Sequence, residues 1–197
     1  MSYRGSLFTY NVEFETINMT VTHALYFSSK KDDSYHQDWD KYNNTEPMPT
    51  TLGDAFDHDG IGSGWDEHDE DVQYHAQFAA PQNCRLQAIA WAFDHQTLDT
   101  DTTGVEIGIV KFGFGVGATA TDTGSWTLIG YADTTAVHNM NGSSTAQVHS
   151  GVIHSDSTES NLLGGQACGI FLQVKGPGSG DGCGITNGII TLTFRAL

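Results

Sequence analysis

Positively charged residues are scarce in this sequence, which has 8 Lys and Arg against 24 Asp and Glu and a formal net charge of −16 at pH 7. A surface of this sign repels the phosphate backbone of nucleic acids and the anionic lipids of membranes. We therefore expect neither nucleic acid nor a membrane as a direct partner. The same charge suits a protein that stays dissolved in salt water or that docks on a basic surface.

Cysteine is also rare, with three residues and no C-x-x-C pair. An odd number without paired spacing argues against both a disulfide framework and a zinc site. We interpret Cys84, Cys168 and Cys183 as reduced, partly buried thiols. Cys168 and Cys183 flank a predicted hairpin, and their pairing stays open because it depends on a geometry that spacing along the chain does not determine.

Long hydrophobic runs are missing as well. No stretch approaches the roughly 18 apolar residues of a membrane-spanning helix. The N-terminal segment MSYRGSLFTYNVEF contains no apolar core of a secretory signal. We expect a protein that is made and folded in a cytoplasm.

No window shows the i, i+3, i+4, i+7 stripe of an amphipathic helix, and no fixed-period repeat is present. Alternating apolar residues separated by clusters of Gly, Asp, Thr and Asn instead predict eight or nine short strands. This pattern is typical of an all-β fold, a β-sandwich or jelly roll. The clearest predicted strands are 84–94, 105–112, 125–131, 145–153, 167–175 and 185–195.

The segment 84–94, CRLQAIAWAFD, is apolar on both faces in a strict two-residue alternation. A strand of this kind is expected to be buried on both faces. The small residues on one face suggest the close approach of another layer or another subunit. One face holds Ile89, Trp91 and Phe93, and the other holds Leu86, Ala88, Ala90 and Ala92.

A chain of 197 residues fits a single domain. We predict three parts: an N-terminal strand or arm at 1–28 that belongs to the domain or docks on it, an acidic loop insertion at 29–73, and a β-sandwich core at 74–197. The alternation in the first part changes phase near 15–18, which predicts a bulge or a bend there.

Residues 57–75, DHDGIGSGWDEHDEDVQYH, combine seven carboxylates with three histidines. An EF-hand starting at Asp57 fails, because Ile61 and His68 stand where calcium ligands are required. Zinc is disfavoured because His58, His68 and His75 have no H-E-x-x-H spacing to hold them on one face. We interpret the stretch as a solvated or partner-facing loop, and whether it binds a cation stays open.

Catalytic arrangements are not recognisable. The acids around Asp57, Asp59 and Asp66 lack the apolar neighbours that raise the pKa of a glycosidase acid. Neither Ser63 nor Ser179 stands in a nucleophile elbow. The glycines of 113–117, GFGVG, lie in β surroundings and do not form a phosphate loop. We predict that the protein is not an enzyme and uses no cofactor.

The four tryptophans divide into two pairs. Trp91 and Trp126 lie in strand patterns and are predicted to be core residues. Trp39 and Trp65 lie in the polar insertion, where each could stack on a sugar ring, anchor a protein contact or cap its own loop. The sugar-binding option supports an alternative function, that of a carbohydrate-binding jelly roll.

The stretch HAQFAAPQNCRLQAIAWAF resembles a unit found in virion structural proteins of tailed bacteriophages, especially marine ones. In that unit a strand enters an F-x-A-P-x-x-G-x-L turn and leaves as a long inner strand. The matching residues are Phe78, Ala80, Pro81 and Leu86, while Cys84 stands in place of the glycine.

Further segments resemble the same proteins in order, so that the resemblance covers about residues 20–197. THALYFSS is similar to the strand before the variable loop, and GVEIGIVKFG to the strand that follows the turn. NLLGGQACGIFLQVKG is similar to an L-x-x-G-D-x-I-x-L strand, with Gln166 in place of the acid. The same strand and turn logic occurs in trimeric jelly rolls of the C1q and tumour-necrosis-factor type.

The resemblance implies a jelly-roll sandwich in a virion, assembled in the host cytoplasm and forming a homo-oligomer, a trimer. It implies a capsid decoration (cement) protein that contacts the major capsid protein or other virion proteins. A receptor-binding fibre or appendage is the alternative within the same class.

Overall fold

The computed structural model describes nine segments of the chain, and every structural statement below concerns these residues. They are 6–20, 23–27, 39–43, 50–56, 78–98, 104–111, 126–136, 147–175 and 182–197. The described residues form strands and two short 3-10 turns, which confirms the all-β class. Within them there is no helix with the length and apolar character needed to cross a bilayer.

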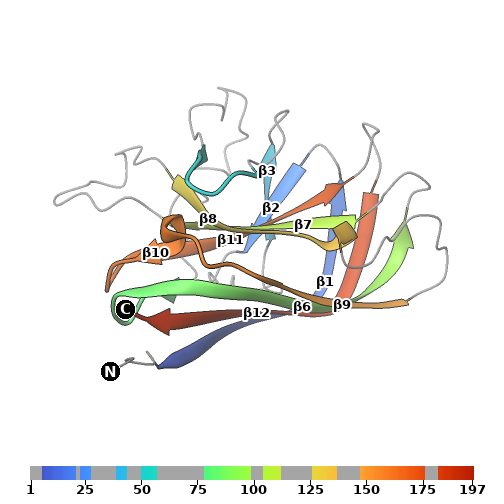
Figure 1. Cartoon of the computed structure of the whole chain (residues 1–197). Coiled ribbons are helices and arrows are strands. Elements are labelled where there is room, and N and C mark those ends of the chain that lie inside the picture. Colours follow the sequence, from blue (N-terminus) through green and yellow to red (C-terminus); the bar gives the residue numbers. More distant parts are fainter. Residues whose placement is uncertain are drawn as a thin grey trace, which may run out of the picture.

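The strands that build the two sheets, and the short strands added to their edges, are shown in Figure 1. Their bounds are β1 Leu7–Thr20, β2 His23–Phe27, β3 Trp39–Asn43, β4 Ala55–Phe56, β5 Phe78–Ala79, β6 Cys84–Leu98, β7 Gly104–Lys111, β8 Trp126–Asp133, β9 Gln147–His154, β10 Asn161–Leu162, β11 Ala167–Lys175 and β12 Gly182–Ala196. The 3-10 turns are η2 Thr134–Ala136 and η3 Thr158–Ser160.

The strands pair in the order of a jelly roll. One layer holds β9, β6, β12 and β1 side by side, and the other holds β2, β11, β7 and β8, with all pairs antiparallel. The chain thus crosses repeatedly between two four-stranded layers, which is the double Greek key of this fold. Figure 1 shows the layers face to face, with β1 leading into β2 at one edge.

The core lies between the layers because alternate residues of each strand point inward. On β12 these are Ile190, Leu192 and Phe194, each no more than 1% exposed. Opposite them, Ile107 and Ile109 of β7 are fully buried. Burial of such alternating side chains is what selects this register, since a slip by one residue would turn them to solvent.

The side chains of residues 84–94 do not divide between the two faces of the strand as predicted. The pairing of β6 with β12 shifts between Phe194↔Leu86 and Thr193↔Ala88, which is a β-bulge. The bulge changes the phase, so fully buried Leu86 points inward like Trp91, while Ala90 is only half-buried on the other side. The expectation that this strand is buried on both faces is therefore confirmed only in part, because on the outward side Ala88 is buried whereas Ala90 and Ala92 are half-buried.

The N-terminal part is built into the sheet. β1 pairs with β12 in one register from Leu7↔Arg195 to Thr20↔Gly182, so of the predicted bulge or bend at 15–18 the bulge is not found in this ladder, whose one missing pair is at Glu15. The irregularity lies in β12 instead, against β6, where Asn187 has a φ of 51°. The predicted insertion 29–73 contributes two short strands, β3 beside β2 and β4 beside β8.

Two sequence motifs that lie far apart in the chain meet at one corner. The Ala80 N–H donates to the Gln166 carbonyl (2.9 Å), and the Gly165 N–H donates to the Ala80 carbonyl (2.7 Å). Phe78 stacks on Tyr10 with ring centroids 4.4 Å apart. The F-x-A-P turn and the start of β11 therefore hold each other in place at the entrance to β6.

Gly151 of β9 gives a test of packing in the sandwich. It pairs with Trp91, and a Cβ at this position would lie 2.5 Å from Trp91 Cζ2. We expect Gly151→Ala to lower the free energy of unfolding by about 1–3 kcal/mol, because the indole has to shift in a packed core. Urea unfolding measures this, with Ser150→Ala as the outward-facing control. Equal stability of the two variants would contradict the packing.

Candidate interaction surface

The residues singled out in the sequence fall largely outside the described structure. The acidic stretch 57–75 with its histidines, Ser63 and Trp65 lies there, as do 113–117 and Ser179. Within the described residues no group of three or more His, Cys, Asp or Glu side chains could hold a metal ion. The interpretation of residues 57–75 as a solvated or partner-facing loop therefore stays a prediction, and whether this stretch binds a cation stays open.

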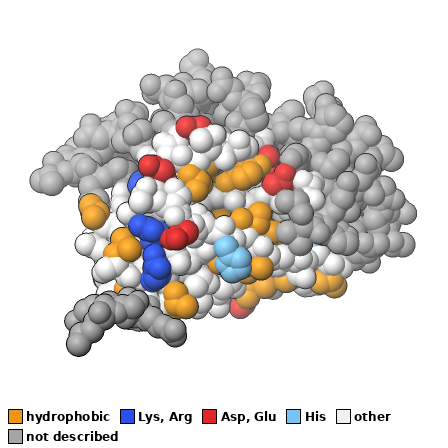
Figure 2. Space-filling view, viewed as in Figure 1, with side chains coloured by type: hydrophobic (Ala, Val, Ile, Leu, Met, Phe, Trp, Pro, Cys, Tyr) orange, Lys and Arg blue, Asp and Glu red, His pale blue; other side chains and the backbone are white. Residues whose placement is uncertain are grey.

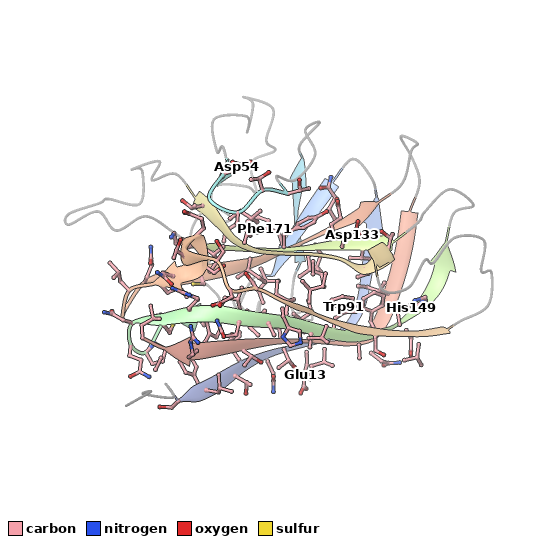
Figure 3. The ribbon with its side chains drawn as sticks, in the orientation of Figure 1. Glu13, Asp54, Trp91, Asp133, His149 and Phe171 are labelled. Carbon is pink, nitrogen blue, oxygen red and sulfur yellow. The ribbon has the colours of Figure 1, made fainter. Side chains whose placement is uncertain are left out.

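Among the four tryptophans, the structure describes the side chain of Trp91 and the backbone of Trp39 and Trp126. Trp91 is buried between the layers, as predicted, and Figure 3 shows it there beside His149. Trp39 begins β3 and Trp126 begins β8, but their side chains are outside the description. Whether Trp39 or Trp65 forms the sugar-stacking platform of the alternative function therefore stays a prediction.

Cys84 and Cys168 are free, buried thiols, as predicted. Since Cys168 is free, it does not pair with Cys183. Burial raises the pKa of Cys84 to about 11 and that of Cys168 still further above its usual range. A thiol of this kind stays protonated at neutral pH and serves neither as nucleophile nor as metal ligand.

The two layers differ in what covers their outer faces. On β11, Phe171 points away from the core between Ile170 and Leu172, yet it is only 1% exposed. Val110 and Leu128 are also fully buried without belonging to the core cluster. The outer side of the β2–β11–β7–β8 layer is thus covered by other parts of the chain.

The outer side of the β9–β6–β12–β1 layer is exposed along β1 and β9 and only half-buried along β6 and β12, apart from buried Ala88, and we call it the outer face. The residues of the four strands lie level in rows set by the strand pairing, with one outward side chain from each strand in a row. Except for Glu13, Asn11 and His154, the residues are small or β-branched, and on β1 and β9 they are exposed. The three central rows are Glu13, Ile189, Ala92 and Ser150; Asn11, Thr191, Ala90 and Val152; and Thr9, Thr193, Ala88 and His154.

Exposed apolar side chains on this layer stand out in a protein with so many acids. Val148 is 71% exposed and Val152 is 46% exposed, both on β9. Between Glu13 at one end and the arginines at the other, the described side chains of the outer face carry no formal charge with His neutral. Grouped exposed apolar side chains on a flat sheet are typical of a protein-binding surface.

Opposite charges mark the two ends of the outer face. Asp94 lies at one end, and Glu13 lies one row nearer the middle, on the outward side of the layer in Figure 3. Arg85 and Arg195 lie next to each other at the other end, since they pair across β6 and β12. The face therefore has an acidic end, an uncharged middle and a basic end.

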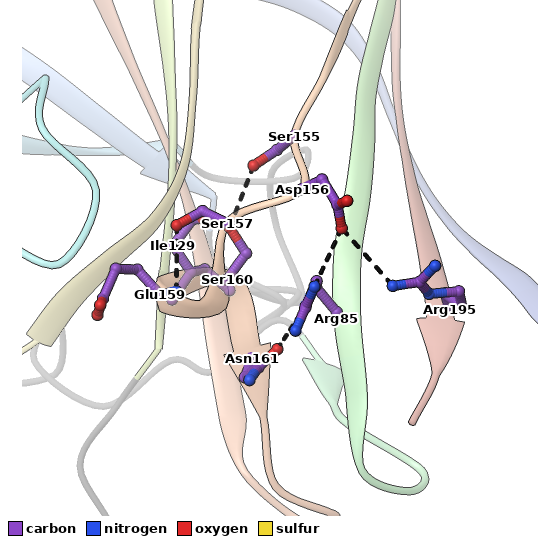
Figure 4. Close-up of polar contacts among 9 residues, drawn as sticks. All are labelled: Arg85, Ile129, Ser155, Asp156, Ser157, Glu159, Ser160, Asn161 and Arg195. Atoms are coloured by element: carbon purple, nitrogen blue, oxygen red, sulfur yellow. Dashed lines mark hydrogen bonds and ion pairs between the residues drawn. The ribbon is translucent and has the colours of Figure 1, made fainter. Parts of the chain in front are cut away.

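The basic end is held by a polar cluster around residues 156–161 (Figure 4). Arg85 donates to Asn161 Oδ1 at 2.7 Å and to Asp156 Oδ1 at 3.0 Å, and Arg195 Nη2 lies 3.6 Å from the same carboxylate. Lys111 Nζ donates to two backbone carbonyls of this segment. All three basic side chains that the structure describes thus contact one segment, and Figure 2 shows basic side chains gathered beside an acidic one.

The hydrogen bond from Arg85 lowers the pKa of Asp156 below its usual value of 3.8. We expect Arg85→Gln to raise this pKa, because the charged form loses its strongest partner. A carboxyl-carbon NMR titration measures the change. Lys111→Gln is the matched control, since Lys111 bonds only to backbone oxygens here. An unchanged Asp156 pKa in the Arg85 variant would contradict the geometry.

Fold and surface together define an all-β jelly-roll protein with one open, largely uncharged sheet face. No family model matches the sequence, and no curated protein matches it. Among solved structures, a chain in the structure of infectious bursal disease virus, Gx strain, is similar over 97% of this chain and 37% of that chain, with 7% identity and a TM-score of 0.27. The present chain spans little more than a third of that chain's length, and at this TM-score the likeness supports no conclusion about function.

Proposed function

We propose that the protein is a structural component of a virion, and specifically a capsid decoration (cement) protein. The observation that carries this proposal is the open outer face of the β9–β6–β12–β1 layer. The order of motifs that resembles phage virion proteins supports it from the sequence side. The proposed role assigns the chain no enzymatic activity, no cofactor, and no direct contact with nucleic acid or membrane.

A sheet face with small side chains and few charges in its middle suits a protein that works by permanent contact. Burying apolar surface contributes about 25 cal/mol per Å² before the costs of association are subtracted. Small side chains such as Ala88, Ala90 and Ala92 lose little conformational entropy when they are covered. The partners in this proposal are further copies of the chain and the major capsid protein.

The acidic remainder of the chain fits the same role. With a net charge of −16, copies repel one another except where charge is absent or complementary. A protein of this kind stays dispersed until its uncharged face meets a matching surface. Association is therefore expected to occur through the outer face.

The test is whether the protein is part of purified particles. An antibody against the chain is used on virions from the source of this sequence, after banding in a density gradient. The proposal predicts many copies per particle that remain bound after washing, and labelling on the particle exterior in electron micrographs. A protein found only in the soluble fraction of infected cells would contradict the proposal.

A further inference from the structure

We propose that two copies of this chain pair outer face to outer face, related by a two-fold axis that runs across the strands above the row of Ala90 and Thr191. This inference deepens the proposed function by naming the partner of the outer face, and it uses the same surface. It differs from the three-fold arrangement that the resemblance implies.

The shape of the outer face permits close approach of a second sheet. Facing sheets in sandwiches lie about 10 Å apart with their strands nearly aligned. The middle of this face presents Ala88, Ala90 and Ala92 flanked by Thr191 and Thr193, and its longer side chains, Glu13, Ile189 and His154, lie in the rows on either side of the Ala90 row. Two such faces can meet without rearrangement of either chain.

Asp94 on one side and Arg85 with Arg195 on the other are placed symmetrically about the central row. Asp94 lies four residues from Ala90 along β6, and Arg195 lies four residues from Thr191 along β12 in the opposite direction. At a rise of about 3.3 Å per residue, each charge is roughly 13 Å from the row. A two-fold rotation about that row brings Asp94 level with Arg85 and Arg195 of the second copy.

The same charges make the other two-fold arrangement, with its axis parallel to the strands, unfavourable. An axis parallel to the strands would place the acidic ends of the two copies together, with Asp94 and Glu13 of each near those of the other. Like charges at close range are unfavourable, whereas the axis across the strands pairs each acidic end with a basic end. Even with Asp156 beside them, Arg85 and Arg195 leave one net positive charge at the basic end.

The partner is a second copy because the face is complementary to itself. A two-fold interface uses the same patch on both subunits, so opposite charges at equal distances on the two sides of the axis complement each other. The outer face has such a pair in Asp94 on one side and Arg85 with Arg195 on the other.

The first experiment is the solution mass of the full chain by light scattering over a range of concentrations. We expect twice the 21.3-kDa chain mass for the unaltered protein. Ala90→Glu places two carboxylates near the axis and halves the mass. Leu163→Glu is the matched control, because Leu163 is exposed in a turn off the outer face, and it leaves the mass unchanged. A trimer, or a mass that Ala90→Glu does not alter, would overturn the proposal.

The charge pairing is tested separately, with variants that do not touch the core. Asp94→Arg is expected to weaken the dimer at least tenfold at low salt, and adding Arg195→Glu in the same chain restores it at least in part. If thermal melting shows that the double variant is folded but its dimer affinity does not recover, the assigned axis is wrong.

The outcomes separate this inference from the proposed function. A dimer in solution that is missing from particles would leave the pairing intact and remove the virion role. A chain that is monomeric at every concentration but abundant on particles would overturn the pairing and leave the virion role.

Discussion

Phe194→Ala lowers the free energy of unfolding by about 3–5 kcal/mol, the range for removing a large buried aromatic ring. Phe194 is fully buried on β12. Its ring stacks on Phe8 of β1 at 5.4 Å and meets Phe78 of β5 edge-on at 5.5 Å. The substitution therefore opens a cavity where β1, β12 and the turn before β6 come together. Urea unfolding followed by tryptophan fluorescence measures the change.

The control at this position is Phe194→Leu. It keeps most of the buried apolar volume, so we expect a loss below about 1.5 kcal/mol. Similar losses for the two variants would show that the ring contacts do not hold this corner, and a loss below about 1 kcal/mol for Phe194→Ala would contradict the packing itself.

Thr134→Val is expected to destabilise the protein by about 1–3 kcal/mol through a different mechanism, the loss of a buried hydrogen bond. Thr134 Oγ1 accepts from the backbone N–H of Val105 at 2.9 Å, and both residues are no more than 1% exposed. Valine has nearly the same shape but no acceptor, so the Val105 N–H is left buried without this partner.

Thr158→Val is the matched control for this variant, because Thr158 is exposed in η3. Surface substitutions of this kind change stability by about 0.5 kcal/mol or less. Equal effects at the two positions would contradict the role of Thr134 in joining η2 to the start of β7.

The strand content could be predicted because it follows from local alternation. The predicted strands 105–112, 167–175 and 185–195 correspond to β7, β11 and β12. Their buried residues repeat every second position, which is a property of the sequence alone. The predicted jelly-roll class is confirmed by the pairing order, which the sequence suggested through strand number and turns.

The openness of the outer face could not be predicted, because it depends on pairing and coverage. The bulge after Leu86 depends on how β6 meets β12, and it reverses the phase of the alternation there. Ala90 and Ala92 were expected to be buried because small apolar residues often are, yet no described segment covers them fully. In the other layer, by contrast, Phe171 points outward and is covered. The small residues on one face of 84–94 were the signal that pointed toward a contact with a partner.

The positions of the charged residues on the outer face could not be predicted from the sequence either. Asp94 and Arg195 are about a hundred positions apart in the chain, and only the β6–β12 register places them at opposite ends of one face. The short strands β3 and β4 also escaped prediction, because two to five residues at a sheet edge carry too little alternation to be recognised.

The central claim is that the outer face is where this protein associates, and crosslinking tests it most directly. Val152 lies on the central row and Val148 lies four residues farther along β9. In the two-fold pair, Val152 faces Val152 of the second copy across about 10 Å, whereas the two Val148 positions are roughly 26 Å apart along the strands. With Cys183→Ser as background and Cys84 and Cys168 buried, a bismaleimide with a spacer of about 10 Å reads out this difference.

The two-fold pairing predicts that Val152→Cys gives a covalent dimer in high yield and that Val148→Cys, although more exposed, gives none. Both variants should react fully with a monofunctional maleimide once the dimer is diluted apart. A crosslinked Val148→Cys dimer, or equal failure of both variants at a concentration where the protein is dimeric, would contradict it.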